Sequence, residues 1–409
     1  MPRKLAIIFL LITVVIDAMG IGLIMPVTPD LIRELLDADL SEAALWGGVL
    51  SASFAVMQFL FGAVIGNLSD RYGRRPVLLA SLMVMAVDYL VMGVTHSIWI
   101  LLIGRLIGGV VSATQSTAAA YMADISKPEE KAANFGLLGA AFGIGFIIGP
   151  MLGGLLGEFG SRTPFFAAAA LAFCNLIFGY FILPETVTDK IRRPLEWRRM
   201  NPFRALRYVG NLPGVGPLLA MFFFYQLAFF VYPSVWAYYT QEKFGWTPWD
   251  VGLSLAAYGI GIAVVQGGLI RLVVPKLGEW RTVMVGMSIS IAAFLSFGFI
   301  SVGWMIYVLI PFSALGMIAQ PALQGIMSKA VTDDAQGELQ GVLTGVGAIA
   351  SIISPLMMTG AFGYFTRAST AIYAPSAPFY LAAVLDGVAL VIFIGAWRRI
   401  TRPKAGLKS

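Results

Sequence analysis

Twelve long apolar runs divide this chain of 409 residues, and each run is long enough to cross a lipid bilayer as a helix. A membrane-spanning helix needs about 20 mostly apolar residues, because the hydrocarbon core is about 30 Å thick. Charged residues make up only 12% of the chain, so too few remain to cover a water-facing surface. The composition therefore excludes an ordinary soluble enzyme, a disordered protein and a nucleic-acid-binding protein, and it predicts an all-α polytopic membrane protein. The twelve predicted spans are 5–27, 43–66, 76–95, 97–120, 134–157, 164–183, 214–238, 249–272, 282–301, 303–328, 338–362 and 376–397.

The positions of lysine and arginine between the spans predict the orientation of the chain. Cytoplasmic loops of membrane proteins carry an excess of these two residues. With both termini in the cytoplasm, 23 of the 28 basic residues lie inside, four lie outside and one, Arg105, lies within a span. We therefore expect a multi-pass protein of the inner (plasma) membrane with both termini cytoplasmic. The net charge of +6 then reflects topology and predicts no nucleic-acid partner.

The sequence repeats itself weakly at an offset of 205 residues. Gly73 matches Gly278, and Pro150 matches Pro355. Transporters built from two repeats hold their substrate between the repeats, near the middle of the bilayer. We therefore expect two pseudo-symmetric halves of six helices each. The predicted boundaries are 1–183 for the N-terminal half, 184–212 for a cytoplasmic linker and 213–409 for the C-terminal half.

A compact charged motif lies between the second and third spans. Its glycines allow a very tight turn. Asp70 can approach the N-terminus of a helix in the opposite half, where the helix dipole favours an anion. Arg71 can pair with an acid such as Asp124 at the inner end of the fourth span, so the motif predicts a latch on the cytoplasmic side. The predicted cytoplasmic gate consists of Gly66, Asp70, Arg71, Gly73, Arg74, Arg75 and Asp124.

The fifth span carries glycines at every fourth position. Gly145, Gly149 and Gly153 share one face of a helix, which permits another backbone to pack closely against them. Pro150 removes a backbone hydrogen-bond donor and favours a bend. Gly154 completes a motif in which a Gly-Pro pair is followed by a Gly-Gly pair.

These two motifs, with Arg105-x3-Gly109 in the fourth span, resemble signatures of the major facilitator superfamily. The Gly-Pro motif is similar to that of its drug:proton antiporters. Within the superfamily the chain closely resembles the tetracycline-resistance efflux pumps, in stretches that include Asp17–Pro26, Val87–Tyr89 and Gln336–Gly341. The resemblance implies alternating access, proton-driven export of a hydrophobic drug from the cytoplasm, and no cofactor.

Two positions depart from the pattern of the tetracycline pumps. Ser290 aligns where those pumps carry a carboxylate in the ninth span, and Ile262 aligns where many carry a histidine in the eighth. The resemblance links both missing residues to handling of the proton and of a metal-chelated drug. The expected substrate is therefore tetracycline-like or another hydrophobic drug.

Charged residues within the spans are candidates for proton coupling, because ionisable groups in hydrocarbon are costly and usually functional. Asp17 lies about 18 Å along its helix from residue 5, near the middle of the bilayer. Asp88 and Arg105 match family positions in the third and fourth spans. Alternatively, Arg105 and one aspartate form a permanent pair that holds the N-terminal half together. Asp386, in the last span, has no evident match in the family.

Glutamine and aromatic residues in the spans predict a substrate cavity. A glutamine amide in an apolar helix can hydrogen-bond a ligand, or it can join two helices. Gln58, Gln226 and Gln324 match family positions, so we favour the ligand role for these three. The predicted cavity residues are Gln58, Gln115, Gln226, Tyr225, Tyr232, Trp236, Gln266, Gln320 and Gln324.

A single histidine, His96, and a single cysteine, Cys174, exclude a histidine-cluster metal site and a disulfide framework. No constellation of catalytic residues is evident, so we expect a transporter and not an enzyme. The expected partners are the substrate, protons and the bilayer, and we expect a functional monomer. Two alternatives remain open: the same fold working as an importer or metabolite transporter, and a membrane enzyme or non-transporting receptor.

Overall fold

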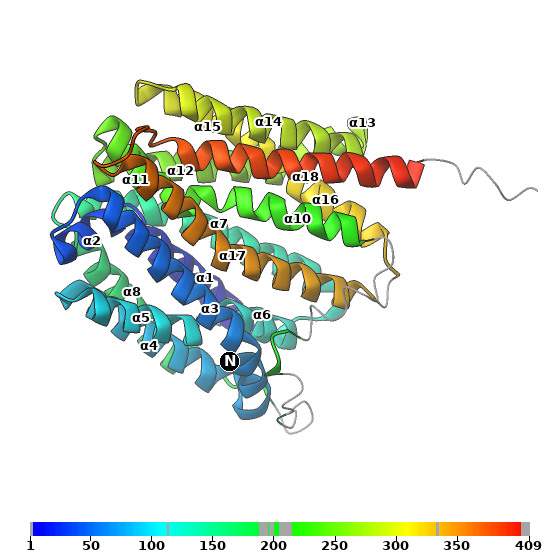
Figure 1. Ribbon diagram of the computed structural model, residues 1–409. Coiled ribbons are helices and arrows are strands. Elements are labelled where there is room, and N and C mark those ends of the chain that lie inside the picture. Colours follow the sequence, from blue (N-terminus) through cyan, green and yellow to red (C-terminus); the bar gives the residue numbers. More distant parts are fainter. Residues whose placement is uncertain are drawn as a thin grey trace, which may run out of the picture. The chain divides into compact units, whose positions relative to one another are not determined.

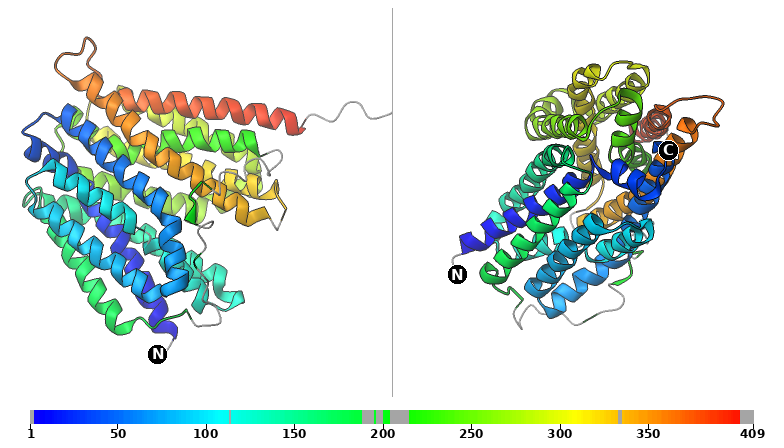
Figure 2. Two further views of the ribbon diagram at one scale, coloured as in Figure 1. Left: turned by 60° about the horizontal axis from the view of Figure 1, so that its bottom comes forward. Right: turned by 90° about the vertical axis from the view of Figure 1, so that its left-hand side faces the viewer.

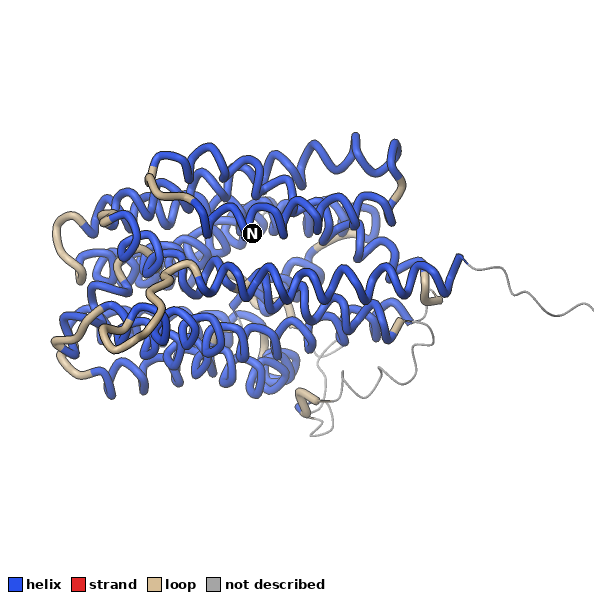
Figure 3. Tube along the Cα trace, turned by 45° about the horizontal axis from the view of Figure 1, so that its top comes forward, coloured by secondary structure: helices blue, strands red, loops and turns tan. Residues whose placement is uncertain are grey.

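The computed structural model describes residues 3–112, 114–187, 195, 200–203, 215–332 and 335–401. Helices joined by short loops make up this part of the chain, and it contains no strand (Figure 3). Within the described residues, twelve helical segments are long and apolar enough to cross a membrane. The all-α polytopic fold with twelve spans is confirmed. Most of the predicted linker, 184–212, lies outside the described residues.

Contacts between helices divide the chain into two compact units. Unit 1 consists of Met1–Pro202 and Trp236–Gly259, and unit 2 consists of Phe203–Val235 and Ile260–Ser409. Within unit 1, α1 packs on α7 and α8, α3 on α5, and α4 on α8, and Figure 2 shows these blue-to-green helices from two directions. The first helices (Figure 1) are α1 (Arg3–Ile24), α2 (Thr28–Leu36), α3 (Leu40–Tyr72), α4 (Arg74–Val94), α5 (Ile98–Val111), α6 (Thr114–Ile125), η1 (Pro128–Glu130), α7 (Lys131–Gly157) and α8 (Thr163–Ile182).

In unit 2, α18 packs on α10 and α14, and α17 packs on α10. Fully buried apolar side chains such as Met221, Val283, Met287, Leu339 and Phe393 form its core. The remaining helices (Figure 1) are α10 (Gly216–Phe229), α11 (Val231–Phe244), α12 (Pro248–Val264), η4 (Val265–Leu269), α13 (Ile270–Leu277), α14 (Glu279–Phe299), α15 (Trp304–Leu315), η5 (Gly316–Ile318), α16 (Ala319–Lys329), α17 (Gln336–Thr366) and α18 (Ala377–Thr401).

Helix α3 extends beyond its predicted span at both ends. It has 33 residues, which at ~1.5 Å per residue is longer than the hydrocarbon core is thick. The carboxylate of Asp39 caps its start by accepting a hydrogen bond of 2.9 Å from the backbone nitrogen of Glu42. Gly73 ends it with φ of +115°. The polar end of α3 therefore carries Asp70 and Arg71 past the apolar part of the span, which hydropathy alone did not predict.

The structure repeats itself at the offset found in the sequence. Gly73 and Gly278 both have positive φ, and each ends one helix and begins the next. The fourth and tenth predicted spans are both interrupted: α5 is followed by Ser112, and 205 residues later Met317 lies in the 3₁₀ turn η5. These matching turns agree with the expected pseudo-symmetry of the two halves.

The eighth span contains a feature that the sequence did not predict. Residues Val265–Leu269 form a π-helix between α12 and α13, and Gln266 within it is exposed. Short π-helical segments inside α-helices are rare and often occur at functional sites. Two adjacent glycines, Gly267 and Gly268, lie in this segment, and a Cβ at either would meet no heavy atom within 4 Å.

Candidate functional site

Asp88 and Arg105 form a buried ion pair between α4 and α5. Nη2 of Arg105 donates a hydrogen bond to Oδ2 of Asp88, and their side chains are only 13% and 3% exposed. The guanidinium carbon lies 5.3 Å from the ring centroid of Phe54 on α3. Arg105 therefore joins three helices of unit 1. The pairing of Arg105 with an aspartate is confirmed for Asp88, and a role of the pair in proton transfer stays a prediction.

Two glycines on α5 make room for the Asp88 carboxylate. A Cβ at Gly108 would stand 2.9 Å from Oδ2 of Asp88, and one at Gly104 would overlap Oδ1. Oδ1 accepts no hydrogen bond within the described residues. One oxygen of this acid is thus held by Arg105, whereas the other lies between helices without a donor.

Asp17 lies on α1 with 9% of its surface exposed. Gly20 is three residues further on the same face, and a Cβ there would stand 2.9 Å from Oη of Tyr89. Asp17, Asp88 and Arg105 all interact electrostatically with the buried Tyr89 hydroxyl. Tyr89 therefore interacts with both predicted proton carriers. We did not predict it as a site residue, although a phenol next to Asp88 in an apolar helix was a usable signal.

The glycine face of α7 packs directly on the backbone of α1. A Cβ at Gly149 would stand 2.6 Å from the carbonyl oxygen of Met19, and one at Gly153 would overlap the carbonyl of Leu23. Gly145 packs in the same way against Val15. The predicted close approach is confirmed, and α7 runs through Pro150 as one continuous helix.

The last glycine of the motif faces a different helix. A Cβ at Gly154 would stand 3.0 Å from Cα of Trp249 and 3.2 Å from Cα of Gly252, at the start of α12. A Cβ at Gly252 would in turn overlap the carbonyl oxygen of Pro150. The motif thus brings the fifth span against both the first and the eighth spans within unit 1.

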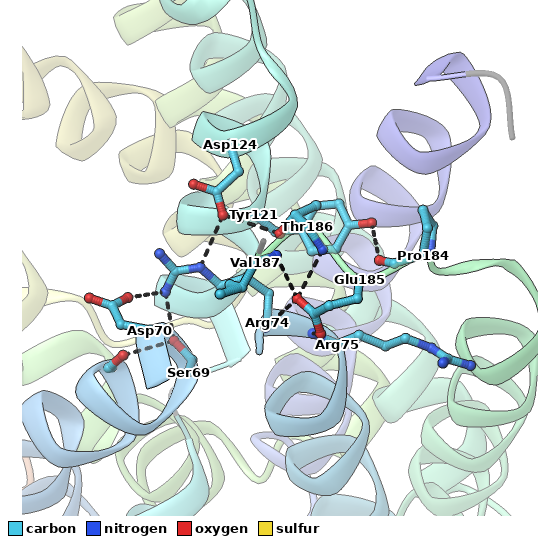
Figure 4. A network of polar contacts seen from close by, with 11 residues as sticks. Ser69, Asp70, Arg74, Arg75, Tyr121, Asp124, Pro184, Glu185, Thr186 and Val187 are labelled. Carbon is cyan, nitrogen blue, oxygen red and sulfur yellow. Dashed lines mark hydrogen bonds and ion pairs between the residues drawn. The ribbon is translucent and has the colours of Figure 1, made fainter. Parts of the chain in front are cut away.

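The charged motif after α3 forms a network of polar contacts in which Arg74 is central (Figure 4). Nε of Arg74 donates to Oδ2 of Asp124 over 3.2 Å. Its Nη1 donates to Asp70 and, over 2.7 Å, to the hydroxyl of Ser69. The prediction that Arg71 pairs with Asp124 is therefore corrected: the Arg71 side chain is exposed, and Arg74 occupies that role because it starts α4 directly after the turn. The contact of Asp70 with the opposite half stays a prediction.

Glu185, which follows α8, caps the start of α4. Its Oε1 accepts a hydrogen bond of 2.9 Å from the backbone nitrogen of Arg74, and its Oε2 accepts one of 3.1 Å from that of Arg75. The backbone nitrogens of Thr186 and Val187 donate to the same carboxylate. A carboxylate at a helix N-terminus satisfies unpaired N–H groups and complements the helix dipole. We missed Glu185, because nothing in its sequence neighbourhood connects it to α4.

Further contacts tie the same network to α6 and α8. The hydroxyl of Thr186 donates to Asp124 over 3.1 Å, and that of Tyr121 donates to the carbonyl of Pro184 over 2.6 Å (Figure 4). Nη2 of Arg75 donates to the carbonyl of Tyr180 over 2.7 Å, and the Arg75 guanidinium lies over the aromatic ring of Tyr180. Gly66 lies one turn before Ser69. The hydroxyl of Ser69 donates a hydrogen bond of 2.8 Å to the carbonyl oxygen of Gly66.

The predicted cavity residues are divided between the two units. In unit 1, Gln58 on α3 is exposed, whereas Trp236 is buried and donates from Nε1 to the hydroxyl of Ser254 over 2.9 Å. Gln115 lies on α6, and its side chain falls outside the described residues.

In unit 2, Tyr232 is packed among Phe294, Phe297 and Phe379, and its hydroxyl lies 2.6 Å from that of Ser313. These contacts make Tyr232 part of the core. Tyr225 and Gln226 neighbour each other on α10, with Tyr225 buried and Oε1 of Gln226 buried without a hydrogen-bond donor among the described residues. Gln266 is exposed in η4, and Gln320 and Gln324 are half-buried on α16.

At the opposite end of unit 1 from the Gly73 turn, the short helix α2 makes polar contacts that we did not predict. Glu34 accepts hydrogen bonds from Ser161 over 2.6 Å and from Nε of Arg162 over 3.0 Å, and these two partners lower the pKa of Glu34. Asp30 accepts one of 3.3 Å from Gln241 on α11. Burial raises the pKa of Asp30 despite this bond.

Residues 10–355 match the family model of the Major Facilitator Superfamily. The chain is 39% identical over 408 residues to the class C tetracycline resistance protein of Escherichia coli, covering 98% of this chain and 100% of that protein. It is 42% identical over 362 residues to the class G tetracycline resistance protein of Vibrio anguillarum, covering 88% and 91%. Among solved structures, a bacterial homolog of the human lysosomal transporter Spinster has a TM-score of 0.76 at 15% identity, covering 99% of both chains, and shows the same fold. The chain therefore belongs to the Major Facilitator Superfamily and, within it, to the family of the tetracycline resistance proteins.

Proposed function

We propose that this protein is a proton-coupled secondary active transporter that exports a hydrophobic small molecule from the cytoplasm by alternating access. The observation that carries the proposal is the group of Asp17, Tyr89, Asp88 and Arg105 inside the spans of unit 1. Family membership supports it, because the relatives are tetracycline resistance proteins. A multidrug resistance protein of Bacillus subtilis is also similar, with 29% identity over 367 residues. We propose no enzymatic activity and no cofactor.

Asp17 is the residue that we assign to proton coupling. Unlike Asp88, it is paired with no arginine or lysine in the described part of the chain. An ionised carboxylate buried in hydrocarbon without a cation costs several kcal/mol, so binding a proton relieves that penalty. Asp17 is thus suited to accept a proton on one side and release it on the other.

The polar network around Arg74 is suited to hold the cytoplasmic end of the N-terminal half in one arrangement. It joins the ends of α3, α4, α6 and α8 through one guanidinium and one carboxylate. Away from this network, the glycines of α7 bring its backbone into close contact with the backbones of α1 and α12.

We propose that a proton from outside neutralises Asp17, that the halves then rock, and that the proton leaves as substrate loads from the cytoplasm.

The proposed orientation of the protein in the membrane rests on the excess of lysine and arginine on one side of the spans. This orientation places both termini and the Arg74 network on the cytoplasmic side of the inner membrane. Each chain carries its own proton carriers, so we propose that the monomer is functional.

Two positions in the C-terminal spans bear on the choice of substrate. Ser290 is buried beside Gly316, and Ile262 on α12 is half-buried, where the tetracycline pumps are expected to carry a carboxylate and a histidine. These two departures extend the proposed substrate to hydrophobic drugs other than tetracycline, whereas the relatives make tetracycline the first compound to test. The relatives are tetracycline resistance proteins, which favours export over import of a metabolite.

A resistance panel tests the proposal. Cells that express the chain and cells that express Asp17→Asn are grown with tetracycline and with a series of antibiotics and dyes. We expect the wild-type chain to raise tolerance to at least one compound and Asp17→Asn to abolish that gain at equal expression. Import would instead increase sensitivity or growth on the compound, and equal tolerance of both strains would contradict the assignment of Asp17.

A further inference from the structure

Asp386 is an acidic residue in the middle of α18 that the proposed cycle does not use. It lies nine residues after Ala377, about 14 Å along the helix at ~1.5 Å per residue. Only 1% of its surface is exposed. It shares the buried face of α18 with Ala382, Ala389 and Phe393, which are fully or nearly fully buried in unit 2. Asp386 thus points into the core of unit 2, between α18 and the helices that pack on it.

Neither oxygen of the Asp386 carboxyl group has a hydrogen-bond partner among the described residues. Buried polar atoms are nearly always hydrogen-bonded, so two orphaned oxygens on one side chain call for a physical explanation. Placing an ionised, unpaired carboxylate there would cost several kcal/mol. A bound proton removes the charge and leaves a neutral acid, which the apolar surroundings tolerate.

The groups that face Asp386 are few. From α10, the buried Tyr225 interacts with it electrostatically. The charged side chains of the other two packed helices, α14 and α17, lie in their first turns, at Glu279, Arg281 and Glu338. No described lysine or arginine forms a salt bridge with Asp386. Among the described groups, Tyr225 is therefore the titratable side chain that interacts with Asp386 from a neighbouring helix.

The sequence of unit 2 makes Asp386 unusual in a second way. The positions 205 residues after Asp88 and Arg105 are Ala293 and Ile310, so the second half has no counterpart of the buried ion pair. Ser290 is likewise uncharged. Between residues 260 and 409 the other acids are Glu279, Asp333, Asp334 and Glu338. Glu279 and Glu338 lie in the first turns of α14 and α17, so among the described acids of this half Asp386 is the one in the middle of a membrane span.

We propose that Asp386 is a second proton-binding site of this transporter, located in the C-terminal half and coupled to the same transport cycle as Asp17. The inference rests on the proposed function. The carboxylate takes up one proton to become a neutral acid and releases that proton to water in the arrangement that opens the site. Tyr225 interacts with the carboxyl group electrostatically, without a hydrogen bond between the two side chains in this structure.

Infrared spectroscopy of the full chain in lipid tests proton binding without any substrate. Protonated carboxylic acids in apolar surroundings have a C=O stretching band separate from that of carboxylates. We expect such a band to fade on titration from mildly acidic to alkaline pH in the wild type, and Asp386→Asn to remove that component. Asp17→Asn should remove a different component. An unchanged spectrum in Asp386→Asn, or a band that never titrates, would overturn the proposal.

Transport in proteoliposomes tests coupling, with tetracycline as the probe. One coupled proton contributes about tenfold to the accumulation ratio for each pH unit of imposed gradient, since ~1.4 kcal/mol corresponds to a factor of ten. Asp386→Asn should lose about that factor while keeping exchange at equal pH. Asp386→Glu should retain much of the gradient dependence, and Val384→Asn, on the exposed face of α18, should behave as the wild type.

The two proposals fail in different ways. Accumulation by Asp386→Asn equal to that of the wild type would overturn coupling through Asp386 and leave export intact. No gradient-driven accumulation by the wild type would contradict proton-coupled export of tetracycline, while the infrared titration would still decide whether Asp386 binds a proton.

Discussion

The backbone nitrogen of Arg74 donates a hydrogen bond of 2.9 Å to Oε1 of Glu185, which lies 111 residues further along the chain. This bond joins the first turn of α4 to the segment after α8, and the Glu185 carboxylate covers Gly73. The charged motif between α3 and α4 is therefore held by a residue outside the motif. Its stability depends on a long-range contact as well as on the local turn.

Gly73→Ala should destabilise the protein, because the new Cβ would collide with the Glu185 carboxylate and the backbone has φ of +115°. We expect a loss of about 1–3 kcal/mol and a lower midpoint of thermal unfolding in detergent. Gly66→Ala is the matched control, since Gly66 is helical and a Cβ there would meet no heavy atom within 4 Å. Equal midpoints for the two variants would contradict this account of the turn.

Glu185→Gln keeps the size of the side chain and removes its charge. The cap of α4 then loses its interaction with the helix dipole and two charge-assisted hydrogen bonds, which we expect to reduce stability by about 0.5–2 kcal/mol. Glu129→Gln, at an exposed side chain in η1, should have no measurable effect. The comparison is made by thermal unfolding at neutral pH, and a larger effect at Glu129 would refute the capping role.

Gly149→Val should push α1 and α7 apart, because the position 2.6 Å from the Met19 carbonyl leaves no space for a side chain. Overpacking typically costs about 1–3 kcal/mol, and here the neighbour is rigid backbone. Gly143→Val is the control on the same helix, where a Cβ meets nothing within 4 Å. Export should be lost in Gly149→Val only. Normal export by Gly149→Val would show that the close contact is dispensable.

Acidification should weaken the contacts of α2 through Glu34. The pKa of Glu34 is lowered by Ser161 and Arg162, so its contribution is present above the ordinary value of 4.5 and is lost as the pH falls through the lowered value. The side chain is 47% exposed, so we expect only about 0.2–1 kcal/mol. Glu34→Gln should therefore be less stable than the wild type at neutral pH and equally stable in acid. A stability difference that persists in acid would contradict the ionic origin of the contact.

The twelve spans could be predicted because long apolar runs admit no other fold in a bilayer. The face shared by Gly145, Gly149 and Gly153 followed from helical periodicity, and the structure places α1 on that face. Burial of Asp17 and pairing of Arg105 followed from the cost of charge in hydrocarbon. These predictions depend on local pattern and on solvation alone.

Other features depend on contacts that local pattern does not encode. The choice of Arg74 over Arg71 as the partner of Asp124 depends on where α4 begins relative to the Gly73 turn. Glu185 reaches that turn only through packing of α4 on α8. The π-helix at Val265–Leu269 adds a residue to one helical turn. This segment has no distinctive composition, so hydropathy does not indicate the change.

The central claim is tested most directly by pH-gradient-driven accumulation of tetracycline in everted membrane vesicles that contain either the wild-type chain or Asp17→Asn. The account predicts that the wild type accumulates the drug only while the gradient lasts. Asp17→Asn should show no accumulation but still exchange labelled for unlabelled drug at equal pH. Gradient-driven accumulation by Asp17→Asn at the wild-type level would contradict the account.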